Sequence, residues 1–179
     1  MNRLATVLFV LFALVVPAAV LAEGAQYNDP AMSFTPPAGY QPLPVPSHDP
    51  ATFEDPAIMA AFVKDAGKQN GSQIMLRMQS FDGDVNAFEM NVENDMRTQS
   101  GDVFIKKTMT KLSNGMPAAW QEITIGSGFD QVKIFQYVWS DGVRGVQLSI
   151  TGRFGSMDES DAKRALSNVS AVAYPKNRY

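Results

Sequence analysis

The sequence predicts an α+β domain in which helices flank an antiparallel sheet. Several segments alternate apolar and polar residues and are followed by turn signals, which is typical of β-hairpins. Two other segments, residues 84–100 and 156–172, repeat apolar residues with helical spacing. Because the helical segments lie between and after the hairpins, the pattern indicates an antiparallel sheet rather than a parallel one.

Residues 1–22 are typical of a secretory signal peptide. Arg3 precedes an uncharged apolar run that begins at Leu4, and Pro17 interrupts this run. The remaining apolar core is shorter than the roughly 20 residues that a membrane-spanning helix needs. Val20 and Ala22 suit the small-residue positions of a cleavage site. We therefore expect cleavage after Ala22, with a retained membrane anchor as the alternative.

Removal of the signal peptide would leave residues 23–179, a length that suits a single domain. The chain has no cysteine, which excludes disulfides, a thiolate nucleophile and lipid attachment at the cleavage site. Its 18 acidic residues outnumber its 15 basic ones. This acidic excess argues against nucleic acid or an anionic membrane as the main partner. We expect a periplasmic or secreted protein that does not insert into the membrane after cleavage.

A proline-rich stretch, residues 36–56, follows a short alternating segment. Because proline cannot donate a ladder hydrogen bond, we expect an extended loop or an edge element there. The alternative is a polyproline segment offered to a partner. The single histidine, His48, lies in this stretch beside Asp49. We interpret it as a solvated loop residue, because no nucleophile motif accompanies it.

The next segment, from Asp55 to Gly67, predicts a helix. Asp55 is a suitable cap, Pro56 suits the first turn, and Gly67 would end the helix. Its apolar residues are Ile58, Met59, Phe62 and Val63. They fall on one helical face, but the run is short and could instead be a strand. Gln73 to Phe81 predicts a strand, with alternate apolar residues on one face: Ile74, Leu76 and Met78.

A second helix is predicted from Asp84 to Ser100. Asp84 can cap its start and Gly101 can end it. Its apolar stripe consists of Val85, Phe88, Val92 and Met96.

Two hairpins are expected after this helix. Val103–Leu112 and Ala118–Ile125 flank a Ser-Asn-Gly turn at residues 113–115. The segment from Asp130 to Phe154 contains Asp141-Gly142, a preferred two-residue hairpin loop. Taking these two residues as the loop gives a definite register. It pairs Trp139 with Arg144, Tyr137 with Val146, and Phe135 with Leu148.

The last helix is expected to begin at Ser156 and to end before Pro175. Ser156 and Glu159 have the spacing of a capping box. The expected buried stripe comprises Ala162, Ala165, Leu166, Val169 and Val172.

Two segments resemble the PsbP-like family of exported proteins. Residues 32–40, Met-Ser-Phe-Thr-Pro-Pro-Ala-Gly-Tyr, are similar to the family's entry strand and its Pro-x-Gly-aromatic turn. Residues 141–142 and 148–152 are similar to its final hairpin, which leads into the last helix. The resemblance implies an α/β/α sandwich and an accessory or interaction protein rather than an enzyme. It carries over no binding residue and no cofactor.

The clearest candidate for a metal site is a calcium loop that begins at Asp82. Asp82, Asp84, Asn86 and Glu93 stand at loop positions 1, 3, 5 and 12 of an EF-hand. However, Ala87 occupies the position that calls for glycine, and the predicted helix runs through the loop. We therefore favour a turn and helix cap without metal, and we expect no cofactor.

Two functional classes follow from these patterns. The favoured class is an exported, non-catalytic accessory protein that binds another envelope or secreted protein, or a small apolar ligand. For such a ligand, Phe135, Tyr137 and Trp139 are candidate groove residues, although this spacing is more typical of a core. The alternative is a hydrolase of an extracytoplasmic polymer. It would use two carboxylates across a cleft, drawn from Asp82, Asp84, Glu89 and Glu122.

Overall fold

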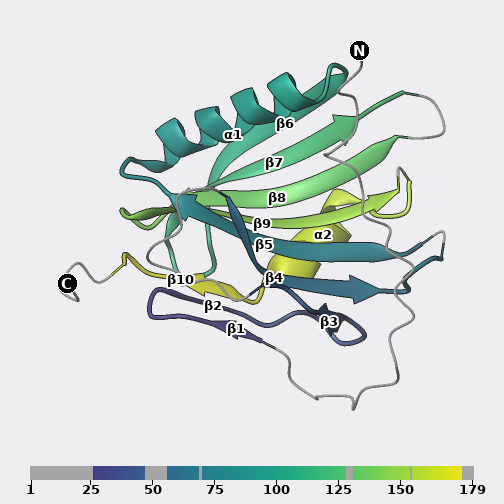
Figure 1. The fold of residues 1–179 in the computed structure, drawn as a ribbon, viewed down its shortest axis with the longest axis horizontal. Helices are drawn as coiled ribbons and strands as arrows, with labels where there is room; N and C mark the ends of the chain where they lie inside the picture. Colours follow the sequence, from purple (N-terminus) through teal and green to yellow (C-terminus); the bar gives the residue numbers. More distant parts are fainter. Residues whose placement is uncertain (1–25, 47–55, 69, 128–130, 154, 175–179) are drawn as a thin grey trace.

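The computed structural model describes residues 26–46, 56–68, 70–127, 131–153 and 155–174. The predicted signal peptide, His48 and Pro175 lie outside these ranges. The described elements follow one another in chain order along the ribbon (Figure 1). They are β1 (Tyr27–Asn28), β2 (Met32–Phe34), β3 (Gln41–Leu43), β4 (Ala57–Lys64), β5 (Ser72–Ser80), α1 (Val85–Gln99), β6 (Val103–Lys111), β7 (Pro117–Ile125), β8 (Val132–Ser140), β9 (Arg144–Arg153), α2 (Glu159–Leu166) and β10 (Val169–Ala171).

The strands form two antiparallel sheets, which confirms the predicted α+β class. The larger sheet has seven strands in the order β3-β4-β5-β9-β8-β7-β6, and the smaller has three in the order β1-β2-β10. Each strand pair in the described part of the chain is antiparallel. Within the described part of the chain, neither helix is long and apolar enough to cross a membrane.

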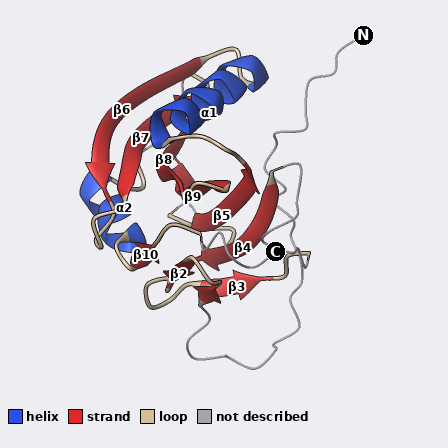
Figure 2. Cartoon of the chain, turned by 90° about the vertical axis from the view of Figure 1, so that its left-hand side faces the viewer, coloured by secondary structure: helices blue, strands red, loops and turns tan. Residues whose placement is uncertain are grey.

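The two helices lie on opposite faces of the seven-stranded sheet (Figure 2). On one face, Phe88 and Val92 of α1 pack against Ala119 and Val138. On the other face, a larger core joins the sheet to α2 and to the three-stranded sheet. Successive side chains on a strand point to opposite faces, so each central strand contributes to both cores.

The alternation in β5 is as predicted from the sequence. Ile74, Leu76 and Met78 are fully buried in the larger core. Leu76 pairs with Leu148 on β9, which places two apolar side chains side by side on this face. The period-two pattern therefore identified both the strand and its buried face.

The predicted helix from Asp55 to Gly67 is wrong, and its strand alternative is correct. Residues 57–64 form β4, which pairs with β5, so that Phe62 lies opposite Ile74. A bulge between Ile58 and Ala60 shifts the alternation within this strand. The shift gives the apolar residues a spacing that a short helix would also show. Just before it, β3 lies at the edge of the sheet, in agreement with the predicted edge element.

The register of the last hairpin differs from the prediction by two residues. Trp139 pairs with Val146 rather than with Arg144. The loop is Gly142-Val143, because the Asp141 N–H donates to the Arg144 carbonyl over 3.1 Å. Gly142 has a φ of 89°, whereas Val143 is not among the residues with positive φ. Glycine therefore serves as the first loop residue, as in a type II′ turn, and an even shift keeps each side chain on its predicted face.

The C-terminal helix is shorter than predicted at both ends. Its cap is Asp158, whose carboxylate accepts from the Asp161 N–H at 2.8 Å, and Ser156 lies outside the helix. The helix ends at Leu166, and Val169–Ala171 forms β10 instead of a further turn. Val169 pairs with Phe34 on β2, so the apolar residues expected on one helical stripe are buried by strand pairing instead.

Candidate functional site

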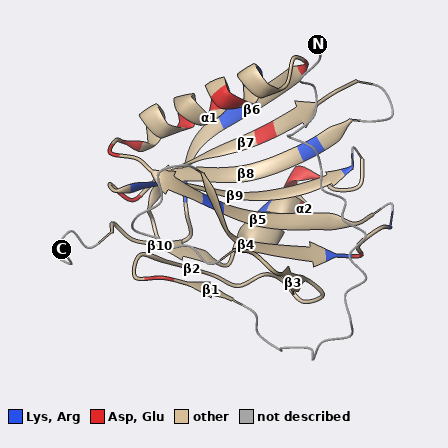
Figure 3. Ribbon diagram, viewed as in Figure 1, with Lys and Arg blue, Asp and Glu red and all other residues tan. Residues whose placement is uncertain are grey.

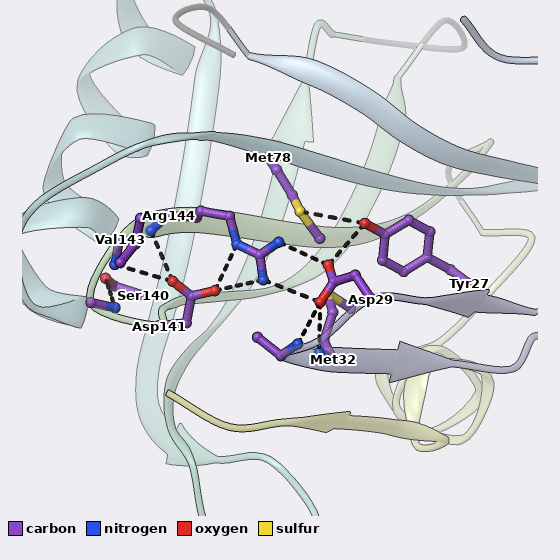
Figure 4. A network of polar contacts seen from close by, with 10 residues as sticks. Tyr27, Asp29, Met32, Met78, Ser140, Asp141, Val143 and Arg144 are labelled. Carbon is purple, nitrogen blue, oxygen red and sulfur yellow. Dashed lines mark hydrogen bonds and ion pairs between the residues drawn. The ribbon is translucent and has the colours of Figure 1, made fainter. Parts of the chain in front are cut away.

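A cluster of buried ionic side chains surrounds Arg144 (Figure 4). The Arg144 guanidinium donates to Asp141 Oδ2 through Nε at 2.7 Å and to Asp29 Oδ2 through Nη1 at 2.8 Å. The Arg144 side chain is 2% exposed, and the two carboxylates are 3% and 1% exposed. One buried cation thus lies between two buried anions.

Aromatic side chains complete the Arg144 cluster. Tyr27 Oη donates to Asp29 at 2.9 Å, and the Tyr174 ring lies over the Arg144 guanidinium at 4.4 Å. Burial and the nearby negative charge of Asp29 raise the pKa of Tyr27, so this phenol keeps its proton. Burial opposes charge on Arg144, but its hydrogen bonds to Asp29 and Asp141, and the negative charges of both carboxylates, raise the pKa of its guanidinium. The cluster therefore remains ionised and closed.

The carboxylate oxygens of this cluster are also bound to the backbone. Asp29 Oδ1 accepts from the N–H groups of Ala31 and Met32, at 2.7 and 2.9 Å. Asp141 Oδ1 accepts from the Arg144 N–H at 2.8 Å. The cluster joins the N-terminal hairpin to the turn between β8 and β9, which favours a structural role over a chemical one.

A second polar chain runs beneath α1 on the opposite face of the sheet. Gln136 Nε2 donates to Gln121 Oε1 at 2.6 Å, and Gln121 Nε2 donates to Glu89 Oε1 at 2.6 Å. Lys107 Nζ donates to Glu89 at 2.9 Å and to Glu93 at 2.8 Å. Acidic positions along α1 accordingly lie beside a basic position on β6 (Figure 3). These contacts fix α1 over β6, β7 and β8.

The same face continues past α1 onto β9, β5 and β4. One row of paired residues crosses this face: Gln136 of β8 pairs with Ser149 of β9, and Ser149 pairs with Met75 of β5. In the adjacent row, Gln147 of β9 pairs with Arg77, and Arg77 pairs with Ile58 of β4. We call this region the open half-face; it comprises Ile58, Met75, Arg77, Gln79, Gln147 and Ser149. These residues are half-buried.

α1 stops short of the open half-face. Its Phe88 reaches Gly145 at the start of β9, where a Cβ would lie only 2.0 Å from the Phe88 ring. Gly145 is therefore required for this close approach. In Figure 1, α1 does not extend over β9, β5 or β4. The described helices thus cover one half of this face and leave the other half uncovered.

The four calcium candidates do not come together. Asp84 Oδ1 accepts from the Ala87 N–H at 2.9 Å and caps α1, while Glu93 binds Arg97 and Lys107. Hydrogen bonds from Lys107 and Arg97 lower the pKa of Glu93. The described residues, Asp82 among them, contain no group of three or more His, Cys, Asp or Glu side chains that could hold a metal.

The aromatic candidates lie in the larger core. Phe135 and Trp139 are fully buried, and Tyr137 is half-buried. The Trp120 ring stacks on Phe135 with centroids 5.9 Å apart and contacts Tyr137 at 4.7 Å. These side chains thus pack between the sheet and α2, as the core interpretation expects.

Two of the candidate hydrolase carboxylates, Glu89 and Glu122, lie on opposite faces of the sheet. Glu89 lies under α1 and binds Gln121. Glu122, the next residue on β7, points to the opposite face, where it binds Lys133 at 2.5 Å. Glu89 and Glu122 therefore do not face each other across a cleft.

No protein-family model and no curated protein sequence matches this chain. A crystal structure of LpqN, a protein involved in cell envelope biogenesis of Mycobacterium tuberculosis, matches with a TM-score of 0.57. The two chains share a fold. They are 15% identical, and the match covers 84% of this chain and 91% of LpqN. A crystal structure from Bacteroides thetaiotaomicron also matches, with a TM-score of 0.48 and 11% identity. This match covers 87% of the present chain and 50% of the Bacteroides chain.

Sequence reasoning missed both arginines. The predicted register names Arg144 only as a partner of Trp139, and alternation predicts only that Arg77 lies on the face of its strand opposite Ile74, Leu76 and Met78. Alternation does place Arg77 on the face opposite Leu76, and this is the one signal that could have drawn attention to it. No local signal links Arg144 to Asp29, because 115 residues separate them in the chain.

Proposed function

We propose that this chain is an exported, non-catalytic accessory protein of the cell envelope that binds another envelope protein through the open half-face. The observation that carries the proposal is the uneven cover of one sheet face. α1 packs over β6, β7 and β8, whereas the half formed by β9, β5 and β4 is left without a described helix. A broad sheet face of this kind suits a protein surface better than a small enclosed ligand.

Two further observations support an envelope role. The N-terminal segment is typical of a signal peptide, which would place the chain in the periplasm or outside the cell. LpqN, with which the chain shares a fold, is involved in cell envelope biogenesis. Membership of the PsbP-like family stays part of this proposal, on the resemblance of residues 32–40, 141–142 and 148–152.

The placement of the carboxylates favours binding over hydrolysis. Glu89 and Glu122 lie on opposite faces of the sheet, and Asp84 caps α1. A glycosidase-like pair would need its carboxyl groups about 5 to 10 Å apart on the same side of a substrate. Asp84 serves instead as a helix cap, and Glu89 and Glu122 serve as ion-pair partners.

Site-specific photo-crosslinking in the producing cell tests the proposal. Benzoylphenylalanine replaces Gln147 on the open half-face or, as the control, Met90, which is 57% exposed on α1. We expect a discrete crosslinked envelope protein with the Gln147 probe and a much weaker product with the Met90 probe. Equal products from both positions, or no product from Gln147, would contradict a binding role for this face.

A further inference from the structure

Arg77 is a half-buried cation that has no acidic partner among the described residues. Its Nε lies 3.1 Å from the Met75 sulfur, which is a weak acceptor. Within the described ranges, no carboxylate lies within ion-pair distance of its guanidinium. Arg144, by contrast, binds two carboxylates. A half-buried charge without a counter-charge destabilises the free protein and is most readily explained by binding.

The neighbours of Arg77 would suit a single planar anion. Ile58 and Gln147 lie opposite it on the two adjacent strands, and Met75 and Gln79 precede and follow it on the same face. The Gln79 amide can donate a hydrogen bond, while Ile58 and Met75 supply apolar surface. Burial lowers the pKa of Arg77 from its ordinary value, which reflects the loss of solvent around the guanidinium.

We propose that Arg77 binds the carboxylate of an Asp or Glu side chain presented by an envelope protein that docks on the open half-face. This inference rests on the proposed function and deepens it. A guanidinium donates two parallel hydrogen bonds to a carboxylate, which gives both strength and orientation. The open half-face holds one cation, so its charge matches one carboxylate rather than a phosphate dianion or a polyanion.

The test measures how substitutions of Arg77 change the yield of the crosslink formed by the Gln147 probe. Arg77→Met keeps the length of the side chain and removes its charge, and Arg77→Glu reverses the charge. Both should lower the crosslink yield at least tenfold, and the Tm of Arg77→Met should stay at or above the wild-type value. The matched control is Arg97→Met, which removes an exposed arginine paired with Glu93 on α1. The yield with this variant should equal that of the wild type.

The partner's side of the contact is tested by charge exchange. The crosslinked peptide is mapped by mass spectrometry, and its acidic residues are replaced one at a time by Arg. One such replacement should abolish the crosslink to the wild-type chain and restore it with Arg77→Glu. Restoration requires direct contact, which a merely structural effect of Arg77 would not produce.

Other results separate this inference from the proposed function. A wild-type crosslink that survives both Arg77 substitutions overturns the role of Arg77 and leaves the binding face standing. No Gln147 crosslink in the wild type overturns both. A crosslink to lipid or to a second copy of the chain overturns the proposed partner. A large fall in Tm for Arg77→Met would show that a carboxylate of the chain itself already occupies the site.

Discussion

Arg144 and Arg77 lie on neighbouring strands but on opposite faces of the seven-stranded sheet. Arg144 points to the face covered by the three-stranded sheet, where Asp29 and Asp141 neutralise it. Arg77 points to the face that α1 covers only in part, and no described carboxylate neutralises it. The covered face uses its cation to join distant segments, whereas the open half-face retains a cation that no described anion satisfies.

The difference shows how one kind of side chain acquires two roles. A buried arginine with two carboxylates contributes to structure, because loss of any member would leave an unpaired charge inside. A half-buried arginine without a counter-charge gains no stability from ion pairing and is available to an incoming anion. The comparison therefore predicts opposite responses to the same substitution.

The largest effect is expected from Arg144→Met. This substitution would leave Asp29 and Asp141 as buried anions without a cation, so the free energy of unfolding should fall by about 3–5 kcal/mol. Urea denaturation followed by circular dichroism measures it. Arg97→Met, which removes an exposed ion pair, should cost no more than about 1 kcal/mol. Similar losses for the two variants would contradict the structural role of the Arg144 cluster.

A smaller loss is expected from Asp29→Asn. The amide keeps the shape of the side chain and one acceptor oxygen, but it removes one of the two charges opposite Arg144. We expect a loss of about 2–3 kcal/mol, as for a hydrogen bond to a charged group within a buried network. In a double-mutant cycle with Arg144→Met, the two losses should not add, because both remove the same ion pair. Additive losses would indicate that Asp29 acts independently of Arg144.

Acid should weaken the same cluster. Burial raises the pKa of Asp29, but hydrogen bonds from Arg144 and from the Ala31 N–H outweigh it and hold this pKa below its ordinary value. Its stabilising contribution is therefore complete above the unfolded-state pKa, roughly 3.9, and is lost as the pH falls through the folded-state value. Unfolding at stepped pH between about 5 and 2 should show a steeper decline for the wild type than for Asp29→Asn. If the stability of the two proteins declined in parallel with falling pH, Asp29 would not account for the loss of stability in acid.

The smallest effect, and one of opposite sign, is expected from Arg77→Met. Replacing an unpaired, partly enclosed charge by an apolar side chain of similar length should leave stability unchanged or raise Tm by about 2–4 °C. Differential scanning calorimetry of the wild type and the variant measures the shift. A marked decrease in Tm would make Arg77 a second structural arginine and would end the contrast with Arg144.

Local patterns in the sequence correctly predicted several elements. Alternation identified β5 and its buried residues, and apolar spacing with the Asp84 cap identified α1. These elements follow from contacts within a few residues, so their signals are present in a short window. The β4 segment lacked such a signal, because its bulge gave apolar residues a spacing common to helix and strand.

Tertiary pairing decided the features that the sequence left open or predicted wrongly. Val169 pairs with Phe34 in β10 and β2, and this pairing replaces the last turns of the predicted helix. The register of the hairpin between β8 and β9 depends on whether Gly142 is the first or the second loop residue. The predicted and the observed register place each side chain on the same face of the sheet, so alternation does not distinguish them. In each case the competing local structures are close in free energy, so long-range burial selects between them.

The sequence by itself determined the α+β class, the buried face of β5 and the apolar stripe of α1, because these depend on residue periodicity. Only the tertiary structure decided which arginine is neutralised. Asp29 and Arg144 lie 115 residues apart and meet because the three-stranded sheet packs on β9. Arg77 lies on the half of the sheet that α1 does not cover, and no described carboxylate pairs with it. Charge pairing depends on distance in space, which periodicity along the chain does not specify.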